Sequence, residues 1–192
     1  MSALTLRNKL KIIKTSIDGV LIIEPKVYGD DRGWFFESFN EKEFLAATDL
    51  SVNFVQDNHS FSRQWTLRGL HYQLESPQGK LIRVSRGSIF DVVVDLRTGS
   101  STFGNWFGAE LSAKNFRQLY APPGIAHGFL ALSDEAETLY KVSSYYNPTK
   151  EVSLLWSDPI ININWPIPSG VELNISPKDM LGLLWPQAPK FK

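Results

Sequence analysis

The chain has 192 residues, 43% of them hydrophobic and 21% charged, which is the composition of a soluble globular protein. Lys and Arg together number 20, as do Asp and Glu, so the formal net charge is zero and no general attraction to nucleic acid or to an anionic membrane is expected. The absence of cysteine excludes disulfides, thiolate metal ligands and cysteine nucleophiles.

The N-terminal stretch, residues 1–23, does not resemble a secretory signal peptide, because basic residues and an aspartate interrupt its apolar residues. No segment of the chain approaches the roughly 20 consecutive apolar residues that a membrane-spanning helix needs. We therefore predict a soluble, cytoplasmic protein. Its length suits one domain, which we expect to cover residues 1–192.

Most of the chain is predicted to form short strands separated by Gly, Pro, Asn and Asp. In chain order, the expected strands cover residues 52–59, 66–74, 79–96 (as a hairpin), 106–111, 116–121, 127–132, 137–144 and 152–156. Many short strands with few helices favour a sandwich, a jelly roll or a closed barrel, and such barrels can bind a small ligand inside.

Two short helices are predicted from their capping residues. Asn40 can cap the first, and Glu43 completes a capping box with it. Ser176 can cap the second, with Pro177 at the first helical position and Asp179 at the third.

The clearest predicted hairpin is GKLIRVSRGSIFDVVVDL, residues 79–96, in which Gly87-Ser88 suits a two-residue II′ turn. Strand alternation divides its second arm into two faces, one with Phe90, Val92, Val94 and Leu96, the other with Ile89, Asp91, Val93 and Asp95. In the first arm, Lys80 shares a face with Ile82 and Val84, where a lysine is unusual. It could escape to water at the strand end, or it could place a cation near a developing enolate or a phosphate.

Three histidines, His59, His71 and His127, are the candidates for a histidine base. His71 lies in RGLHYQ, residues 68–73. Strand alternation places it on one face with Gly69 and Gln73, and places Arg68 on the other face with Leu70, Tyr72 and Leu74. The face of His71 would point to solvent in an open sheet but would line the cavity of a barrel, so from the residues alone it is either an ordinary strand residue or a base.

Tyr140 and Asp179 also have two interpretations each. Tyr140 alternates with Thr138 and Val142 and could face inward, where a neutral phenol can donate a proton, although tyrosines in cores more often serve only packing. Asp179 could serve only in the capping box, or its carboxylate could orient an imidazole. The spacing of the sequence leaves both alternatives open.

Several basic and aromatic residues could bind a nucleotide, because guanidinium groups suit phosphate and flat rings stack on bases. They are Arg32, Arg68, Arg83, Arg86, Tyr145 and Tyr146. The sequence contains no P-loop and no G-x-G-x-x-G motif, so nucleotide binding by either of those loops is not expected.

The segment PPGIAHGF, residues 122–129, contains P-x-G-x-x-H and resembles the second cupin motif. The first cupin motif supplies H-x-H and then a glutamate as metal ligands, whereas here His71 is followed by Tyr72 and Gln73 before Glu75. Ala131 replaces the asparagine that ends the second motif. This is a poor ligand set for a 2-His-1-carboxylate or three-His centre, so the resemblance implies a cupin-like barrel without a metal.

More specifically, the chain resembles the dTDP-4-dehydrorhamnose 3,5-epimerase family of metal-free, cupin-like enzymes. The resemblance runs from about residue 12 to 182 and is carried, in order, by EPKVYGDDRGWFFESFN, FVQDNHS, LRGLHYQ, QGKLIRV, GSIFDVVVDLR, FGNWFGAELS, APPGIAHGF, LYKVSSYYNP, LLWSDP, INWP and SPKD. One such segment would be weak evidence, but their ordered series is highly specific. It implies a mainly β, cupin-like jelly-roll barrel with a few short helices.

The resemblance also implies roles for residues at matching positions. His71 matches the base, Asp179 its paired carboxylate, Tyr140 the proton donor on the opposite face, and Lys80 the lysine beside the developing enolate. The residues that match the substrate site are Arg32, Glu37, Gln56, Asn58, Arg68, Asp91, His127 and Tyr146, with Tyr145 as the alternative to Tyr146 for stacking on the base. A homodimer is implied in which Arg32 reaches the neighbouring subunit's site, and no cofactor is implied.

The implied reaction is epimerisation at C3 and C5 of dTDP-4-dehydro-6-deoxy-α-D-glucose, giving dTDP-4-dehydro-β-L-rhamnose for dTDP-L-rhamnose biosynthesis. Both hydrogens are α to the C4 ketone, so a base can remove each one if the enolate is stabilised. Three alternatives remain: an epimerase that inverts only C3 or C5, a metal-dependent cupin enzyme, and a non-catalytic module that binds nucleotide sugars.

Overall fold

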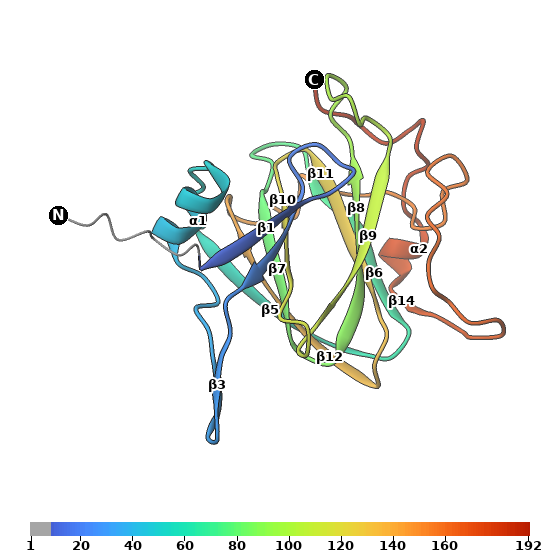
Figure 1. Cartoon of the computed structure of the whole chain (residues 1–192). Coiled ribbons are helices and arrows are strands. Elements are labelled where there is room, and N and C mark those ends of the chain that lie inside the picture. The colour runs from blue at the N-terminus through green and yellow to red at the C-terminus, as the bar shows by residue number, and fades with distance from the viewer. Residues whose placement is uncertain (1–8) are drawn as a thin grey trace.

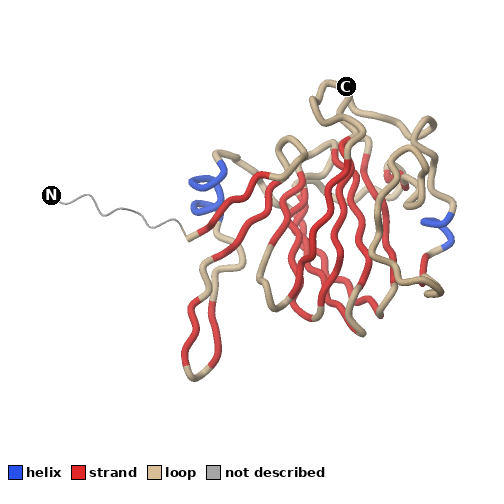
Figure 2. The backbone as a smooth tube through the Cα atoms, turned by 45° about the vertical axis from the view of Figure 1, so that its right-hand side comes forward, coloured by secondary structure: helices blue, strands red, loops and turns tan. Residues whose placement is uncertain are grey.

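The computed structural model describes residues 9–192, and their fold is built mainly from β-strands (Figure 1). Two six-stranded sheets face each other across a shared core. Figure 2 shows these strands as the body of the molecule, with irregular C-terminal loops along one side. The predicted cupin-like jelly-roll barrel with a few short helices is confirmed.

The strands of the two sheets come from segments that alternate along the chain. The first sheet contains, in spatial order, β1 (Leu10–Lys14), β2 (Leu21–Pro25), β10 (Gln118–Ala121), β7 (Lys80–Arg86), β12 (Glu135–Val142) and β5 (Gln56–Arg63). The second contains β13 (Glu151–Ser153), β6 (Thr66–Gln73), β11 (Ile125–Ala131), β8 (Ser88–Asp95) and β9 (Trp106–Ser112), with β14 (Asn174–Ile175) paired in parallel to β6. Each predicted strand overlaps an observed one, although their ends differ by a few residues.

The predicted hairpin over residues 79–96 is wrong. Its arms are β7 and β8, but β7 lies between β10 and β12 in the first sheet, whereas β8 lies between β11 and β9 in the second. Gly87, with a φ of +71°, carries the chain from one sheet to the other. A Cβ atom there would clash with Ser133 Oγ and the Glu135 carbonyl, so the turn is packed against the start of β12.

Two hydrophobic clusters explain why β8 is apolar on both faces. Ile89 and Val93 belong to the core between the sheets, together with Ile82 of β7. Val92 and Val94 face the opposite way, into a cluster that includes residues of the C-terminal segment such as Trp165. The second sheet is therefore covered on its outer side by the chain that follows β13 (Figures 1 and 2).

Both predicted helices are present and begin at the predicted caps. Helix α1 (Glu41–Thr48) follows Asn40, whose Oδ1 accepts from the backbone N–H groups of Lys42 and Glu43 at 3.1 and 3.3 Å. Helix α2 (Pro177–Met180) is a single turn, in which Ser176 Oγ accepts from the backbone N–H of Asp179 at 3.2 Å. The cap on α2 thus fixes the backbone position of Asp179.

A two-stranded hairpin, β3 (Tyr28–Asp30) and β4 (Gly33–Phe35), projects away from the barrel (Figure 1). Its large apolar residues are exposed: Trp34 retains 62% and Phe35 retains 66% of its accessible surface. In a single chain this hairpin therefore has little to pack against.

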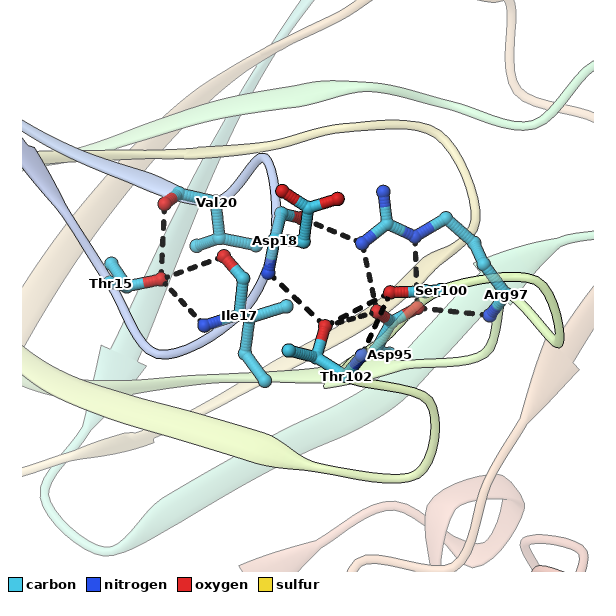
Figure 3. A network of polar contacts seen from close by, with 8 residues as sticks. All are labelled: Thr15, Ile17, Asp18, Val20, Asp95, Arg97, Ser100 and Thr102. Atoms are coloured by element: carbon cyan, nitrogen blue, oxygen red, sulfur yellow. Dashed lines mark hydrogen bonds and ion pairs between the residues drawn. The ribbon is translucent and has the colours of Figure 1, made fainter.

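A polar network joins the loop before β2 to the loop after β8 (Figure 3). The Asp95 carboxylate accepts from Arg97 Nε at 2.9 Å and from Thr102 Oγ1 at 2.7 Å, and Arg97 also donates to the Asp18 carbonyl at 2.6 Å. Burial acts to raise the pKa of Asp95, but these hydrogen bonds outweigh it and lower the pKa to about 2. The ionised Asp95 carboxylate and Arg97 thus hold these two loops together.

Candidate active site

A cavity of about 720 Å³ lies between the two sheets and carries most of the predicted site residues on its walls. Its polar lining residues are Gln56, Asn58 and Ser60 of β5, Thr66, Arg68 and His71 of β6, Gln78, Lys80 of β7, His127 of β11, Tyr140 of β12, Tyr146, Glu151 of β13, Asn174 of β14, Ser176, and Lys178 and Asp179 of α2. A volume of this size is typical of small-molecule sites. The barrel thus gathers residues far apart in the sequence around one space.

His71 and Asp179 form a hydrogen-bonded pair on the wall of this cavity, with 2.6 Å between His71 Nε2 and Asp179 Oδ1. Burial acts to raise the pKa of Asp179, but the hydrogen bonds from His71 and from the backbone N–H of Gly69 outweigh it and lower the pKa. Because an ionised carboxylate can only accept, His71 Nε2 carries the hydrogen. In the neutral ring Nδ1 then keeps its lone pair and can act as a base.

This pair joins segments 108 residues apart in the chain. The parallel pairing of β14 with β6 brings the start of α2 beside His71. The backbone of Asp179 belongs to the helix cap, while its carboxylate accepts from His71 and from Gly69. The two interpretations of Asp179 are therefore compatible, because they use different atoms of the residue.

Arg68 lines the same cavity as His71, which contradicts the alternation predicted for this strand. His71 is paired with His127, but Arg68 is paired with Phe129, so β6 contains one more residue than β11 over this interval. Such a bulge changes which face a side chain takes. Gly69 lies within it at a φ of +113°, where a Cβ atom would come within 2.6 Å of the backbone of the neighbouring strand.

Lys80 points inward, as the apolar face that it shares with Ile82 and Val84 suggests. Only 7% of its surface is exposed, and its Nζ donates to the backbone carbonyl of His71 at 3.3 Å. Burial lowers the pKa of Lys80 to about 8, although the carboxylates of Glu151 and Asp91 act to raise it. Near pH 7 the amine is still mostly protonated and provides a cation inside the cavity.

Tyr140 lies on the wall opposite His71, because β12 belongs to the first sheet and β6 to the second. It is flanked by Asn58 of β5 and Ile82 of β7. Burial raises the pKa of Tyr140, and the charge of Arg68 only partly offsets this effect. The phenol is therefore protonated and can donate toward a ligand from the side opposite the imidazole.

A second histidine and aspartate pair lies beside the first. His127 Nε2 is 2.7 Å from Oδ1 of Asp91, which is completely buried. His127 lines the cavity, whereas Asp91 lies behind it. Asp91 can therefore influence a ligand through His127 and Lys80.

Of the two candidate tyrosines, Tyr146 lines the cavity, and Tyr145 lies in a neighbouring depression with 70% of its surface exposed. The backbone N–H of Tyr146 donates to Gln56 Oε1 at 3.1 Å, and Gln56 Nε2 donates to Asn58 Oδ1 at 2.8 Å. The side chains of Gln56 and Asn58 are thus connected to the loop that carries Tyr146.

Arg32 and Glu37 do not line this cavity in the single chain. Arg32 lies at the tip of the β3–β4 hairpin, where it pairs with Asp30 and is 90% exposed. Glu37 lines another pocket and pairs with Lys9 at 3.1 Å. These two residues are the predicted substrate contacts that one chain does not bring to the site.

Glu151 and Lys178 line the cavity although the sequence did not suggest them. They form an ion pair, and Tyr146 Oη donates to Glu151 Oε2 at 3.0 Å. Burial acts to raise the pKa of Glu151, but the bond from Lys178 and the charge of His71 outweigh it and lower the pKa. Lys178 could have been found as the neighbour of Asp179, whereas Glu151 begins a three-residue strand without a local signal.

Within residues 9–192, no three His, Asp or Glu side chains are grouped as a metal ion would require. Across the same part of the chain, no helix has both the length and the apolar character needed to cross a membrane.

A family model described as dTDP-4-dehydrorhamnose 3,5-epimerase matches residues 14–186. The chain belongs to this family. The dTDP-4-dehydrorhamnose 3,5-epimerase of Shigella flexneri is 53% identical over 183 residues, which cover 95% of this chain and 99% of that protein. The family assignment thus extends over nearly the whole sequence.

Solved structures of the 3,5-epimerase family share the fold. The dTDP-6-deoxy-D-glucose-3,5-epimerase of Legionella pneumophila, in complex with dTDP-4-keto-L-rhamnose, is 48% identical, with a TM-score of 0.88 over 91% of this chain and 92% of that one. A 3′-monoepimerase from Streptomyces bikiniensis, in complex with dTDP-quinovose, is 34% identical, with a TM-score of 0.83 over 90% of this chain and 87% of that one. The fold therefore also occurs in a protein described as acting on one carbon.

Proposed function

We propose that this chain is a dTDP-4-dehydrorhamnose 3,5-epimerase, which inverts C3 and C5 of dTDP-4-dehydro-6-deoxy-α-D-glucose to give dTDP-4-dehydro-β-L-rhamnose. The observation that carries the proposal is the location of the His71–Asp179 pair on one sheet and of Tyr140 on the facing sheet. Inversion of a carbon requires a proton to leave on one side and return on the other. A base and an acid on facing walls meet that requirement.

The first step uses His71 Nδ1 as the base. It removes the proton from C3 or C5, the electron pair of the C–H bond forms a C=C bond to C4, and the ketone oxygen becomes an enolate. The Asp179 carboxylate, 2.6 Å from Nε2, holds the ring in the required tautomer and stabilises the imidazolium that forms.

Lys80 stabilises the enolate in this proposal. A buried cation that is already in place interacts more strongly with developing negative charge than a solvated one, and it needs little reorganisation during the reaction. Its hydrogen bond to the His71 carbonyl keeps the amine close to the strand that carries the base.

The second step uses Tyr140 as the acid. The enolate reforms the C4 ketone as its C=C electron pair takes the phenolic proton at C3 or C5, on the face opposite His71. Water then restores the proton to Tyr140 and removes one from His71. Only protons move, so no electron acceptor or donor is consumed, and no cofactor is part of the proposal.

The nucleotide part of the substrate is proposed to lie against Tyr146, whose ring stacks on the base. Gln56, Asn58 and Arg68 supply hydrogen bonds and positive charge, and His127, backed by Asp91, contacts the sugar. Their location around one cavity supports these roles. Glu151 and Lys178 join this group as polar residues at the same cavity.

We also propose a homodimer, in which Arg32 reaches the site of the neighbouring subunit. The β3–β4 hairpin projects from the barrel and exposes Trp34 and Phe35, which favours burial against another chain (Figure 1). Glu37, at the base of this region, would complete the same contact.

We further propose that residues 1–192 form one catalytic domain that works in the cytoplasm, and that the product serves the synthesis of dTDP-L-rhamnose. The lack of cysteine is compatible with a reducing compartment.

The second candidate is an epimerase that inverts one carbon of a related nucleotide 4-keto-deoxysugar. The 34% identity to a 3′-monoepimerase supports this second candidate. The same base and acid could serve one carbon if the intermediate were held in a single orientation.

Hydrogen exchange in D₂O tests the proposal. The protein is incubated with dTDP-4-keto-6-deoxyglucose, and deuterium is located by NMR. Deuterium at both C3 and C5 is expected, with loss of exchange in His71→Ala. His59→Ala is the matched control, because His59 pairs with Glu137 outside the cavity. Deuterium at one carbon only would establish the second candidate instead, and no deuterium at either would sink the proposed reaction.

A further inference from the structure

The loop that carries Tyr146 is not held by hydrophobic packing. It connects β12 to β13, and residues 145–149 are all exposed. Tyr146 itself retains 50% of its surface. A ring in such a loop can stack on a base in one orientation only if polar contacts fix the backbone around it.

Gln73 provides these contacts from beneath the loop. It is the last residue of β6, and only 4% of its surface is exposed. Its Oε1 accepts from the backbone N–H of Asn147 at 2.8 Å, and its Nε2 lies 3.3 Å from the carbonyl oxygen of Tyr145, to which it donates. One buried side chain therefore binds the backbone immediately before and immediately after Tyr146.

The same amide also anchors the segment that follows β6. Gln73 Nε2 donates to the carbonyls of Glu75 and Ser76 at 2.9 and 2.8 Å. An amide offers two N–H groups to these three carbonyls, so one hydrogen is shared. Gln73 thus ties two loops to the strand that carries His71.

Two further contacts complete the position of Tyr146. Its backbone N–H donates to Gln56, and its hydroxyl donates to Glu151. Glu151 is also the residue of β13 that pairs with Gln73. Tyr146 is therefore held by its own hydrogen bonds to Gln56 and Glu151, and its two neighbours in the chain are held by Gln73.

We propose that Gln73 is a positioning residue for nucleotide recognition, which holds the backbone on both sides of Tyr146 so that the ring is oriented before the base arrives. The inference rests on the proposed function, in which Tyr146 stacks on the base. Fixing the loop in advance reduces the conformational entropy that binding would otherwise cost. Gln73 itself does not line the cavity, so it acts through Tyr146.

A double-mutant cycle on dTDP binding tests this role, with the dissociation constant measured by calorimetry. Gln73→Met keeps the length of the side chain but removes its hydrogen bonds, and we expect about tenfold weaker binding. Tyr146→Ala is expected to weaken binding about tenfold or more. In the Tyr146→Ala background, Gln73→Met should change binding less than twofold, because the residue it positions is gone.

The control variant is Gln64→Met. Gln64 is also partly buried and donates to a backbone carbonyl, that of Leu132 at 2.8 Å, but it lies outside the cavity lining. Its dTDP affinity should equal that of the unaltered protein. In turnover, Gln73→Met should raise KM several-fold while kcat stays within about twofold. A general loss of folded protein would instead lower kcat and leave KM unchanged.

Two outcomes would overturn the inference: unchanged dTDP affinity in Gln73→Met, or equal losses with and without Tyr146. If Gln73→Met does not fold, Gln73→Glu, which keeps the acceptor for Asn147, is judged by the same cycle. Failure of the unaltered protein to bind dTDP would instead contradict the proposed function. The two results are therefore distinguishable.

Discussion

His71 and His127 lie directly opposite each other on β6 and β11, and each is paired through Nε2 with an aspartate. The two pairs differ in what surrounds the carboxylate. Asp179 also accepts from the backbone of Gly69, whereas Oδ2 of the fully buried Asp91 has no hydrogen-bond partner among the described residues. The hydrogen bond from His127 is therefore the main compensation for burying the Asp91 carboxylate.

Removal of His127 should destabilise the protein more than removal of the whole pair. His127→Leu leaves the Asp91 carboxylate buried without a donor, and we expect a loss of about 3 kcal/mol in the free energy of unfolding. The double variant Asp91→Leu/His127→Leu should lose less, because no unpaired charge remains. Denaturant unfolding of the two variants provides the comparison. A larger loss in the double variant would show that the carboxylate is not the source of the cost.

Asp179→Asn should impair catalysis while the fold remains intact. The amide has the shape of the carboxylate but carries no charge to stabilise the imidazolium, so we expect kcat to fall about 10²-fold or more. Asp49→Asn is a suitable control, because Asp49 caps α1 in the left-handed region, which asparagine tolerates. Turnover and melting temperature are measured together. An unchanged kcat in Asp179→Asn would exclude the carboxylate from the mechanism.

Tyr140→Phe should separate proton removal from proton return. Without the phenol, His71 can still remove a proton and exchange it with D₂O, but the opposite face lacks its donor. Epimerisation should therefore fall more, by about 10²-fold, than deuterium wash-in at the carbon that is deprotonated first. NMR follows both in one sample. Equal loss of the two would contradict the division of labour between His71 and Tyr140.

The charge of Lys80 should set an upper pH limit on activity. Its pKa is about 8 because of burial, and only the protonated amine stabilises the enolate. The rate should therefore fall as pH rises through about 8. Lys80→Met should be nearly inactive at every pH, so residual activity with the same alkaline decline would point to another group.

The same lysine should make stability depend on pH. Its pKa is lowered from 10.5 in the free side chain to about 8 in the folded protein, so between these values the unfolded chain binds more protons. Stability should rise with pH across this window. At pH 7 Lys80→Met should be more stable by on the order of 3 kcal/mol, and this difference should shrink toward pH 10. Chemical unfolding at several pH values measures it.

Much of the strand pattern was predictable because it depends on neighbouring residues. Gly, Pro and Asn separate the apolar runs locally, and Asn40 and Ser176 act as helix caps through atoms a few residues away. The inward direction of Lys80 also follows from its alternation with Ile82 and Val84. Such features require no knowledge of which strands pair.

Strand pairing could not be predicted in the same way. The turn at Gly87 is compatible with a hairpin, but β7 and β8 pair with other strands. They meet as facing strands of two sheets, and both contribute side chains to the core between them. Arg68 shares the cavity with His71 only because β6 has one extra residue opposite β11. A bulge is a property of two strands together, so one strand's alternation does not reveal it.

The short strands, the helix caps and the set of ionisable residues able to move a proton follow from the order of the residues, because they depend on local chemistry. Strand pairing and packing bring His71 to Asp179 across 108 residues, place Tyr140 on the facing sheet, put Glu151 on the cavity wall and set Gln73 under the loop that carries Tyr146. The reason is that a barrel brings distant segments together through the burial of their apolar faces. Side chains that share the enclosed space therefore need have no relation in sequence.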